Sequence, residues 1–171
     1  MGAAAVLAGM RDGEMPSDEQ EAADPWPAQL RAPFSRQFPG LALPGDMPLT
    51  PAEADTVPGA LGAARIGLVP AARPADVLPL LGWTPSDQSD ALPIAAVVRS
   101  REDRFGARLL RVGFAEISVL AARPPEDTGH AQHLAAEQMV FCDECAGHGL
   151  SDVPSITGAL LASPIWTFWW D

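Results

Sequence analysis

Proline placement is the feature that most limits how this chain can fold. Nine of the 18 prolines lie within residues 1–60, which also carry nine acidic residues and three arginines. Proline lacks a backbone donor and clashes inside a helix, so prolines this frequent exclude a long helix or a central strand. We therefore expect residues 1–60 to be an acidic, largely irregular or partly disordered extension, disordered at least to about Asp24. Residues 61–171 are expected to form one compact domain.

The chain is strongly acidic. It has 22 acidic residues against 11 basic ones, a formal charge of −11 and a sequence pI near 4.5. Such a charge repels nucleic acid and anionic membranes, so neither is expected as a partner. No arginine follows Arg123, so a protein partner recognised by charge is expected to face residues 126–171 or the proline-rich extension.

The sequence predicts a cytoplasmic protein. Its first residues are mildly apolar but lack the basic region of a signal peptide, and charged residues follow directly. No apolar run approaches the roughly 18 residues that a membrane-spanning helix needs. Two cysteines are too few for a disulfide scaffold.

Apolar spacing and helix caps predict the elements of the domain. The run at 65–69 indicates a buried strand, and Pro74 suits the first turn of a short helix that ends at Gly82. Asp90 can cap a helix over about 91–105, which Gly106 ends. Strands at 108–114 and 116–122 form a hairpin, and helices follow at about 129–145 and 155–162. An aromatic strand at 165–171 completes the pattern.

This order predicts an α+β fold. A small mixed or antiparallel sheet, made of the hairpin and the aromatic C-terminal strand, is packed by three to four helices. Grouped strands with helices around them differ from the strict alternation of a doubly wound sheet.

Several short motifs follow one another along about 105 residues at the C-terminal end of the chain. They are Gly82-Trp83, Glu102-Asp103-Arg104-Phe105-Gly106-Ala107, Arg123-Pro124-Pro125, Ala135-Ala136-Glu137-Gln138, Phe141-Cys142 and Trp166-Thr167-Phe168-Trp169-Trp170-Asp171. On these residues, positions 65–171 resemble the bacterial family called domain of unknown function 4253 (DUF4253). The resemblance implies a fold but no activity, and it does not reach the first 60 residues.

Three positions depart from the pattern that the resemblance implies. The family usually carries tryptophan where this chain has Arg101, and often aspartate where it has Ala115. It also carries Cys-Pro-Asp where this chain has Cys142-Asp143-Glu144. A family activity that used polar groups at these places would be altered here.

Histidines and cysteines cluster in His130-x2-His133-x8-Cys142-x2-Cys145-x2-His148. Two thiolates and two imidazoles can complete a tetrahedral zinc site. In a helix, however, the cysteines share a face with small apolar residues, whereas His130 and His133 lie on another face. The pair also falls at the C-terminal end of a helix, where the dipole disfavours a reactive thiolate. We expect no metal and no cofactor, and keep the five residues as alternative ligands.

Acidic residues that could serve acid–base chemistry are Glu137, Asp143, Glu144 and Asp171. In Asp171 the side chain adjoins a terminal carboxylate, and close carboxylates raise one pKa. The simpler interpretation is that this end is solvated or paired with Arg104 or Arg108. Neither a phosphate-binding loop nor a nucleophile elbow occurs in the sequence.

Arg101 is the most unusual residue of the predicted core. It follows Ile94 by seven positions and Val97 by four, which places it on the apolar stripe of its helix. A buried unpaired guanidinium would be strongly destabilising. We therefore expect Arg101 to extend to solvent or to meet a carboxylate, either Asp171 or one in the extension.

Bulky residues occupy both faces of the predicted last strand, with Trp166, Phe168 and Trp170 on one and Ile165, Thr167 and Trp169 on the other. Burial of the second face needs the extension or a partner to cover it. Most of these side chains are expected to pack in the core, and an exposed tryptophan edge would suit a ligand groove.

Two functions fit these patterns. The first is a non-enzymatic, acidic protein-interaction module, because no nucleophile or cofactor loop is recognisable. The alternative is an enzyme or small-ligand binder with a pocket near Glu137, Cys142 and the C-terminal Trp/Asp cluster. The residues expected to form a ligand or partner surface are Trp83, Arg101, Glu137, Cys142, Trp169, Trp170 and Asp171.

Overall fold

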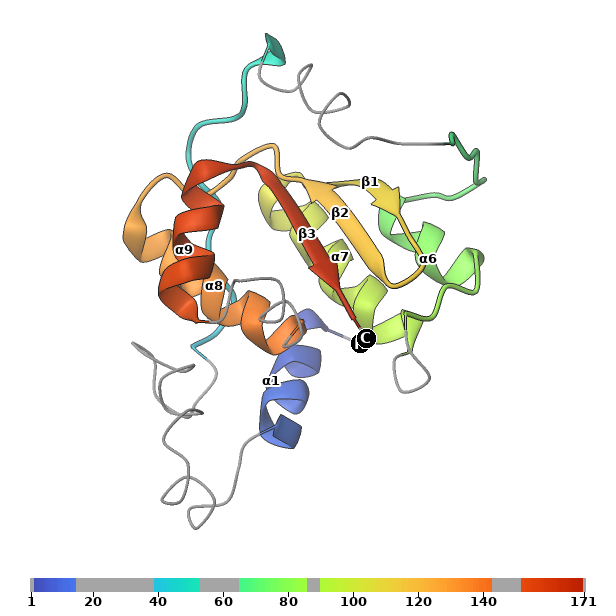
Figure 1. The fold of residues 1–171 in the computed structure, drawn as a ribbon, viewed down its shortest axis with the longest axis horizontal. Helices are drawn as coiled ribbons and strands as arrows, with labels where there is room; N and C mark the ends of the chain where they lie inside the picture. The colour runs from blue at the N-terminus through green and yellow to red at the C-terminus, as the bar shows by residue number, and fades with distance from the viewer. Residues whose placement is uncertain (1, 15–38, 53–64, 86–89, 143–151, 171) are drawn as a thin grey trace.

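A three-stranded antiparallel sheet stands beside and in front of a group of helices (Figure 1). The computed structural model describes residues 2–14, 39–52, 65–85, 90–142 and 152–170. The strands are β1 (Arg108–Val112), β2 (Glu116–Leu120) and β3 (Ile165–Trp169), in the order β1-β2-β3. β1 and β2 form the predicted hairpin, and the aromatic strand β3 pairs antiparallel with β2.

The helices of the described residues are α1 (Ala3–Glu14), α6 (Val77–Leu80), α7 (Ala91–Phe105), α8 (Thr128–Phe141) and α9 (Val153–Ala162), with a 3-10 turn, η1 (Pro74–Asp76), before α6. Aspartate side chains cap α7, α8 and α9: Asp90 accepts from the Leu92 amide, Asp127 from that of His130 and Asp152 from that of Ser155. Gly106, at φ 61°, ends α7 in the left-handed conformation that glycine adopts without strain. The α+β class is confirmed.

The core lies between the sheet and α7, which runs behind it in Figure 1. Ile117 and Val119 of β2 are fully buried, and across the ladder they face Phe168 and Trp166. The Trp166 ring meets Phe105 of α7 edge-on, with ring centroids 5.1 Å apart. Edge-to-face pairs of this kind stabilise a core beyond the area that they bury.

The other face of β3 is more open. Thr167 is exposed, and its hydroxyl oxygen lies 2.9 Å from that of buried Ser118. Ile165 and Trp169, on the same face, are half-buried. Bulky side chains therefore reach both faces, as expected, and the second face remains partly open to solvent.

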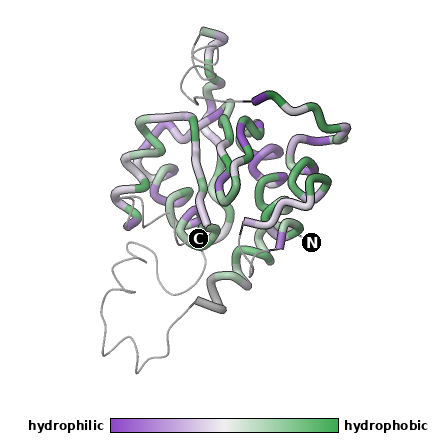
Figure 2. Tube along the Cα trace, turned by 45° about the vertical axis from the view of Figure 1, so that its right-hand side comes forward, coloured by the Kyte–Doolittle hydropathy of each residue, from purple (hydrophilic) through white to green (hydrophobic). Residues whose placement is uncertain are grey.

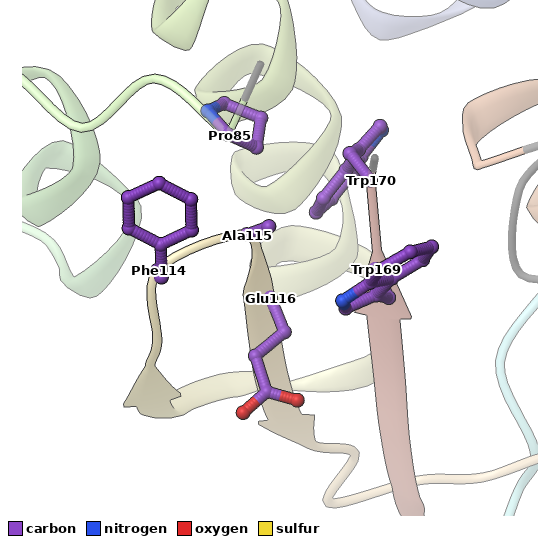
Figure 3. Close-up of a pocket in the computed structure, with 6 residues that line it drawn as sticks. All are labelled: Pro85, Phe114, Ala115, Glu116, Trp169 and Trp170. Atoms are coloured by element: carbon purple, nitrogen blue, oxygen red, sulfur yellow. The ribbon is translucent and has the colours of Figure 1, made fainter.

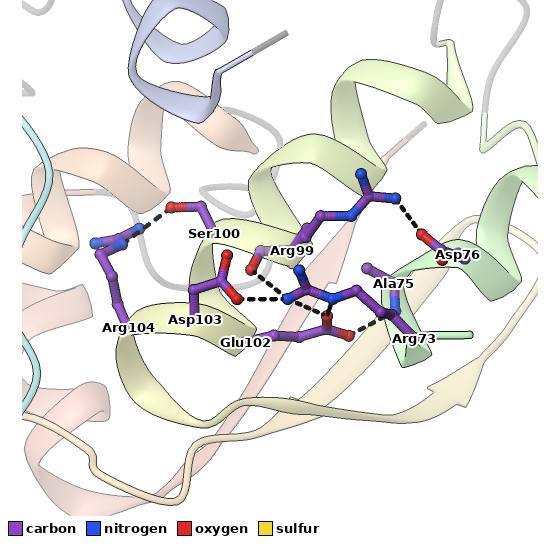
Figure 4. Close-up of polar contacts among 8 residues, drawn as sticks. All are labelled: Arg73, Ala75, Asp76, Arg99, Ser100, Glu102, Asp103 and Arg104. Carbon is purple, nitrogen blue, oxygen red and sulfur yellow. Dashed lines mark hydrogen bonds and ion pairs between the residues drawn. The ribbon is translucent and has the colours of Figure 1, made fainter. Parts of the chain in front are cut away.

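Ion pairs fasten η1 to the last turns of α7 (Figure 4). Arg73 donates from Nε to Glu102 and from Nη2 to Asp103, at 2.9 and 2.6 Å. Glu102 also accepts from the Ala75 amide at 2.6 Å, which satisfies a donor at the start of η1. A second ion pair joins Arg99 to Asp76. This connection positions the segment that leads to Trp83.

The prediction of a buried strand at 65–69 is wrong. The segment is extended but belongs to no strand of the sheet, and Ile66 and Leu68 are 95% and 97% exposed. The segment is coloured mainly as hydrophobic in Figure 2, and apolar residues of this kind are usually expected in a buried strand. A short apolar run carries no periodicity that would show whether a partner covers it.

The extension differs from the irregular chain that we expected. Residues 3–14 form α1, which contacts α7 and α8 and buries Leu7 completely. The first proline of the chain is Pro16, so nothing in the sequence prevents a helix before it.

Among the described residues, no helix is long and apolar enough to span a bilayer.

Candidate functional site

A pocket opens where the hairpin turn meets the end of β3 (Figure 3). Its volume is about 390 Å³, and it is lined by Pro85, Phe114, Ala115, Glu116, Trp169 and Trp170. Figure 3 shows the rings of Phe114 and Trp170 on either side of Ala115, with Pro85 above them. The lining thus contains three aromatic side chains and one carboxylate, and the Glu116 carboxylate points away from Pro85, Phe114 and Trp170 in Figure 3.

Backbone hydrogen bonds fix the floor of this pocket. The amide of Gly113 donates to the Glu116 carbonyl at 2.7 Å, which closes the turn. The Trp170 amide donates to the Ala115 carbonyl at 2.8 Å and so continues the β2–β3 ladder past Trp169. The two tryptophans are therefore held against the turn by main-chain contacts.

Trp83 supports the pocket from behind. Its indole Nε1 donates to the Gly113 carbonyl at 2.9 Å, and its ring meets Trp170 edge-on at 5.6 Å. Trp83 and Trp170 are only 8% and 7% exposed, whereas Trp169 is half-buried. Trp83 is thus a positioning residue for the turn and for Trp170.

Phe114 is the most accessible wall of the pocket, at 94% exposed. Beside it, Glu116 pairs with Arg111 across the hairpin, with Oε1 2.7 Å from Nη2. Both partners are partly exposed, and such surface pairs contribute about 0–1 kcal/mol. The Glu116 carboxylate can therefore interact with another cation at little energetic cost.

A second polar group is buried between α7 and α8. Arg104 donates to both oxygens of Glu137, from Nη1 to Oε2 at 3.0 Å and from Nη2 to Oε1 at 2.6 Å. The Glu137 side chain is fully buried and that of Arg104 is 14% exposed. Glu137 is therefore engaged in a two-pronged ion pair.

Arg101 lies beside this pair. It is fully buried, its guanidinium carbon is 4.4 Å from the ring centres of both Phe141 and Phe168, and Nε is 3.7 Å from Oε1 of Glu137. Desolvation lowers the pKa of Arg101 to about 10, against the attraction of Glu137. Arg101 does not extend to solvent, and the carboxylate that it meets is Glu137.

Residues 65–171, more than half of the chain, match the family described as Domain of unknown function (DUF4253). The chain belongs to this family. No curated protein and no solved structure matches the chain.

Cys142 of the DUF4253 domain is buried and disulfide-bonded. Its sulfur accepts from the Trp169 amide at 3.3 Å and lies 2.9 Å from the Trp169 carbonyl oxygen. These contacts connect the end of α8 to the end of β3. The other cysteine, Cys145, lies outside the described residues.

The candidate metal ligands of the domain do not gather in its described part. Nδ1 of His130 lies 3.2 Å from an oxygen of Asp127, and Nε2 of His133 lies 3.0 Å from the Gly40 carbonyl oxygen. Among the described residues, no three His, Cys, Asp or Glu side chains are placed to hold a metal ion. Cys145 and His148 lie outside them.

The structure separates the predicted surface into two places. Trp169 and Trp170 line the pocket and Trp83 supports it, whereas Arg101, Glu137 and Cys142 are buried and do not line it. Asp171 lies outside the described residues. Of the positions that depart from the family pattern, Ala115 is in the pocket wall, Arg101 is in the core and Asp143 is outside the described residues.

The sequence analysis missed Pro85, Phe114 and Glu116 as pocket residues. One signal could have indicated Phe114: a large apolar residue next to Gly113 in a hairpin turn, where polar residues are usual. Pro85 carries no such signal in the sequence, although its neighbour Trp83 is hydrogen-bonded to the turn at Gly113.

Proposed function

We propose that this DUF4253 domain is a cytoplasmic, non-enzymatic protein-interaction module that binds a basic segment of a partner protein at the aromatic pocket. The observation that carries the proposal is Phe114, which is 94% exposed at the rim of a pocket lined by two tryptophans. Aromatic side chains exposed beside a pocket are typical of interaction surfaces, where tryptophan and other large rings anchor a partner.

Charge selects the class of partner. The chain carries a formal charge of −11, and Glu116 is the one ionisable side chain among the described residues that line the pocket. Aromatic faces attract a guanidinium or ammonium group, and a nearby carboxylate adds to this attraction. An arginine or lysine side chain of the partner therefore suits the pocket, whereas nucleic acid and an anionic membrane do not.

The pocket supports binding better than catalysis. Among the described residues, its lining offers one carboxylate and no thiol, imidazole or hydroxyl side chain. Glu137 and Cys142, which an enzyme pocket would have used, are committed to buried contacts with Arg104 and Trp169.

Site-specific photo-crosslinking tests this proposal in cells that produce the protein naturally. Phe114 is replaced by p-benzoylphenylalanine, and the same substitution at Leu161, which is 44% exposed on α9, is the control. Position 114 is expected to give a discrete crosslinked species that position 161 does not, and Glu116→Gln is expected to weaken it. The proposal fails if both positions give the same products, or if position 114 gives none.

A further inference from the structure

Residues 39–50 of the extension lie against the domain as an extended segment, which we call the strap. In Figure 1 the strap runs past α8 toward the top of the molecule. Within the described residues, it is joined to the domain by contacts with α7, with α8 and with the chain around Ala122–Glu126. These contacts define what the surface beneath the strap recognises.

The buried ion pair binds the main chain of the strap at Ala42. The Ala42 amide donates to Oε2 of Glu137 at 3.2 Å, and the Ala42 carbonyl accepts from Nη1 of Arg104 at 2.7 Å. The pair thus satisfies both backbone groups of one residue, as a neighbouring β-strand would. A guanidinium and a carboxylate placed in this way recognise a peptide backbone rather than a particular side chain.

Further polar contacts of the strap are also made by its backbone, while Ala42 lies in the hydrophobic core and Leu41 packs against it. The Gly40 carbonyl oxygen lies 3.0 Å from His133, and the amides of Met47 and Leu49 donate to Glu126 and to the Ala122 carbonyl at 2.5 and 2.7 Å. By contrast, the side chains of Leu43 and Met47 are 67% and 68% exposed.

At Ala42 and Gly45 the domain leaves no room for a larger side chain. Ala42 is fully buried, so its methyl group fills the space available. At Gly45 an added Cβ would lie 2.2 Å from the Pro124 carbonyl oxygen, a distance at which the backbone must move. The surface therefore selects an extended peptide with a small residue followed three positions later by glycine.

We propose that the surface under the strap, centred on Arg104 and Glu137, is a peptide-binding site, and that the strap is an exchangeable ligand of it within the same chain. Its ligand in another molecule is an extended segment with the pattern small-x-x-Gly. Segments held by backbone hydrogen bonds, with exposed apolar side chains, belong to the low-stability parts of a protein and open locally. This site is separate from the aromatic pocket and does not depend on the function proposed for it.

A labelled synthetic peptide of residues 39–50 tests the proposal by fluorescence polarisation with the full-length protein. Ala42→Trp is expected to displace the strap, because the indole does not fit where a methyl group is fully buried. Since a closed strap reduces apparent affinity in proportion to the open fraction, Ala42→Trp should bind the peptide at least about tenfold more tightly than wild type. Leu43→Trp, at the exposed neighbouring position, is the matched control and should behave as wild type.

A peptide with valine in place of Gly45 should fail to bind the Ala42→Trp protein. The proposal is overturned if folded Ala42→Trp binds the peptide no better than Leu43→Trp, or binds both peptides equally.

Hydrogen exchange of the wild-type protein keeps the test independent of whether Ala42→Trp folds. The amides of Ala42 and Leu49 are expected to exchange at least about a hundredfold faster than those of Ile117 and Val119 in β2, because the strap opens without global unfolding. Equal protection of strap and sheet would show that the strap is a permanent part of the fold.

Discussion

Glu137→Gln is expected to lower the free energy of unfolding by about 3–5 kcal/mol, because a buried ion pair that loses one partner leaves the other charge uncompensated. Here two guanidinium groups lose their carboxylate. Arg104 is bonded to both oxygens of Glu137, and Nε of Arg101 is 3.7 Å from Oε1. Glutamine has nearly the same shape, so the change tests charge rather than packing. Urea unfolding monitored by tryptophan fluorescence measures the effect.

Glu116→Gln is the matched control for this prediction. It removes the same charge from another Arg–Glu pair, but that pair lies at the surface, with side chains 43% and 27% exposed. Surface pairs contribute about 0–1 kcal/mol, so the control should change stability by no more than that. Similar losses in the two variants would contradict the role that the geometry assigns to Glu137.

Local chemistry made much of the domain predictable from its sequence. Asp90 and Gly106 mark the two ends of α7 because a side-chain acceptor and a left-handed residue act within one turn. The hairpin and the aromatic strand β3 follow from residue spacing alone. The stripe that placed Arg101 in the core was also correct, since it depends only on helical periodicity.

Tertiary contacts made the rest unpredictable. Glu137 and Arg104 are 33 positions apart, and the sequence analysis considered Arg104 only as a partner of Asp171. The strap was missed because its backbone makes its polar contacts with the domain, and a sequence pattern does not report these. Residues 65–69 show the converse, since their apolar side chains gave a pattern that no strand covers. Patterns report what side chains prefer, and they do not report which backbone groups meet.

Arg101→Met is expected to raise the free energy of unfolding by about 1–4 kcal/mol, the opposite sign from Glu137→Gln. Replacing a buried charge with an apolar residue of similar volume is often neutral or stabilising, provided that no other charge is left unpaired. Glu137 keeps its two-pronged pair with Arg104 when Arg101 is removed. Within the described residues, none of the three Arg101 side-chain nitrogens has a hydrogen-bond partner. A methionine sulfur between Phe141 and Phe168 also makes favourable contacts with aromatic rings.

The pH dependence of the stability difference between Arg101→Met and the wild type identifies the cause of that difference. Burial lowers the pKa of Arg101 from its ordinary value to about 10. Between these two values the unfolded chain binds the proton that the folded protein has released, so wild-type stability rises with pH. This gain in wild-type stability is complete above the pKa that Arg101 has in the unfolded chain. It is lost as the pH falls through about 10. The chain has no tyrosine, and all 11 of its basic residues are arginines, so no lysine or tyrosine titrates in this window.

Urea unfolding of both proteins at pH 7 and at several pH values from about 9 to 12 measures the difference. Arg101→Met should be the more stable protein at neutral pH, and the difference in free energy of unfolding should narrow as the pH rises past about 10, where Arg101 loses its proton in the folded protein. If the difference in free energy of unfolding stays constant over this range, packing and not the desolvated charge is the reason that Arg101 destabilises the protein. Loss of stability in Arg101→Met at pH 7 would mean that the guanidinium is a net stabilising part of the core.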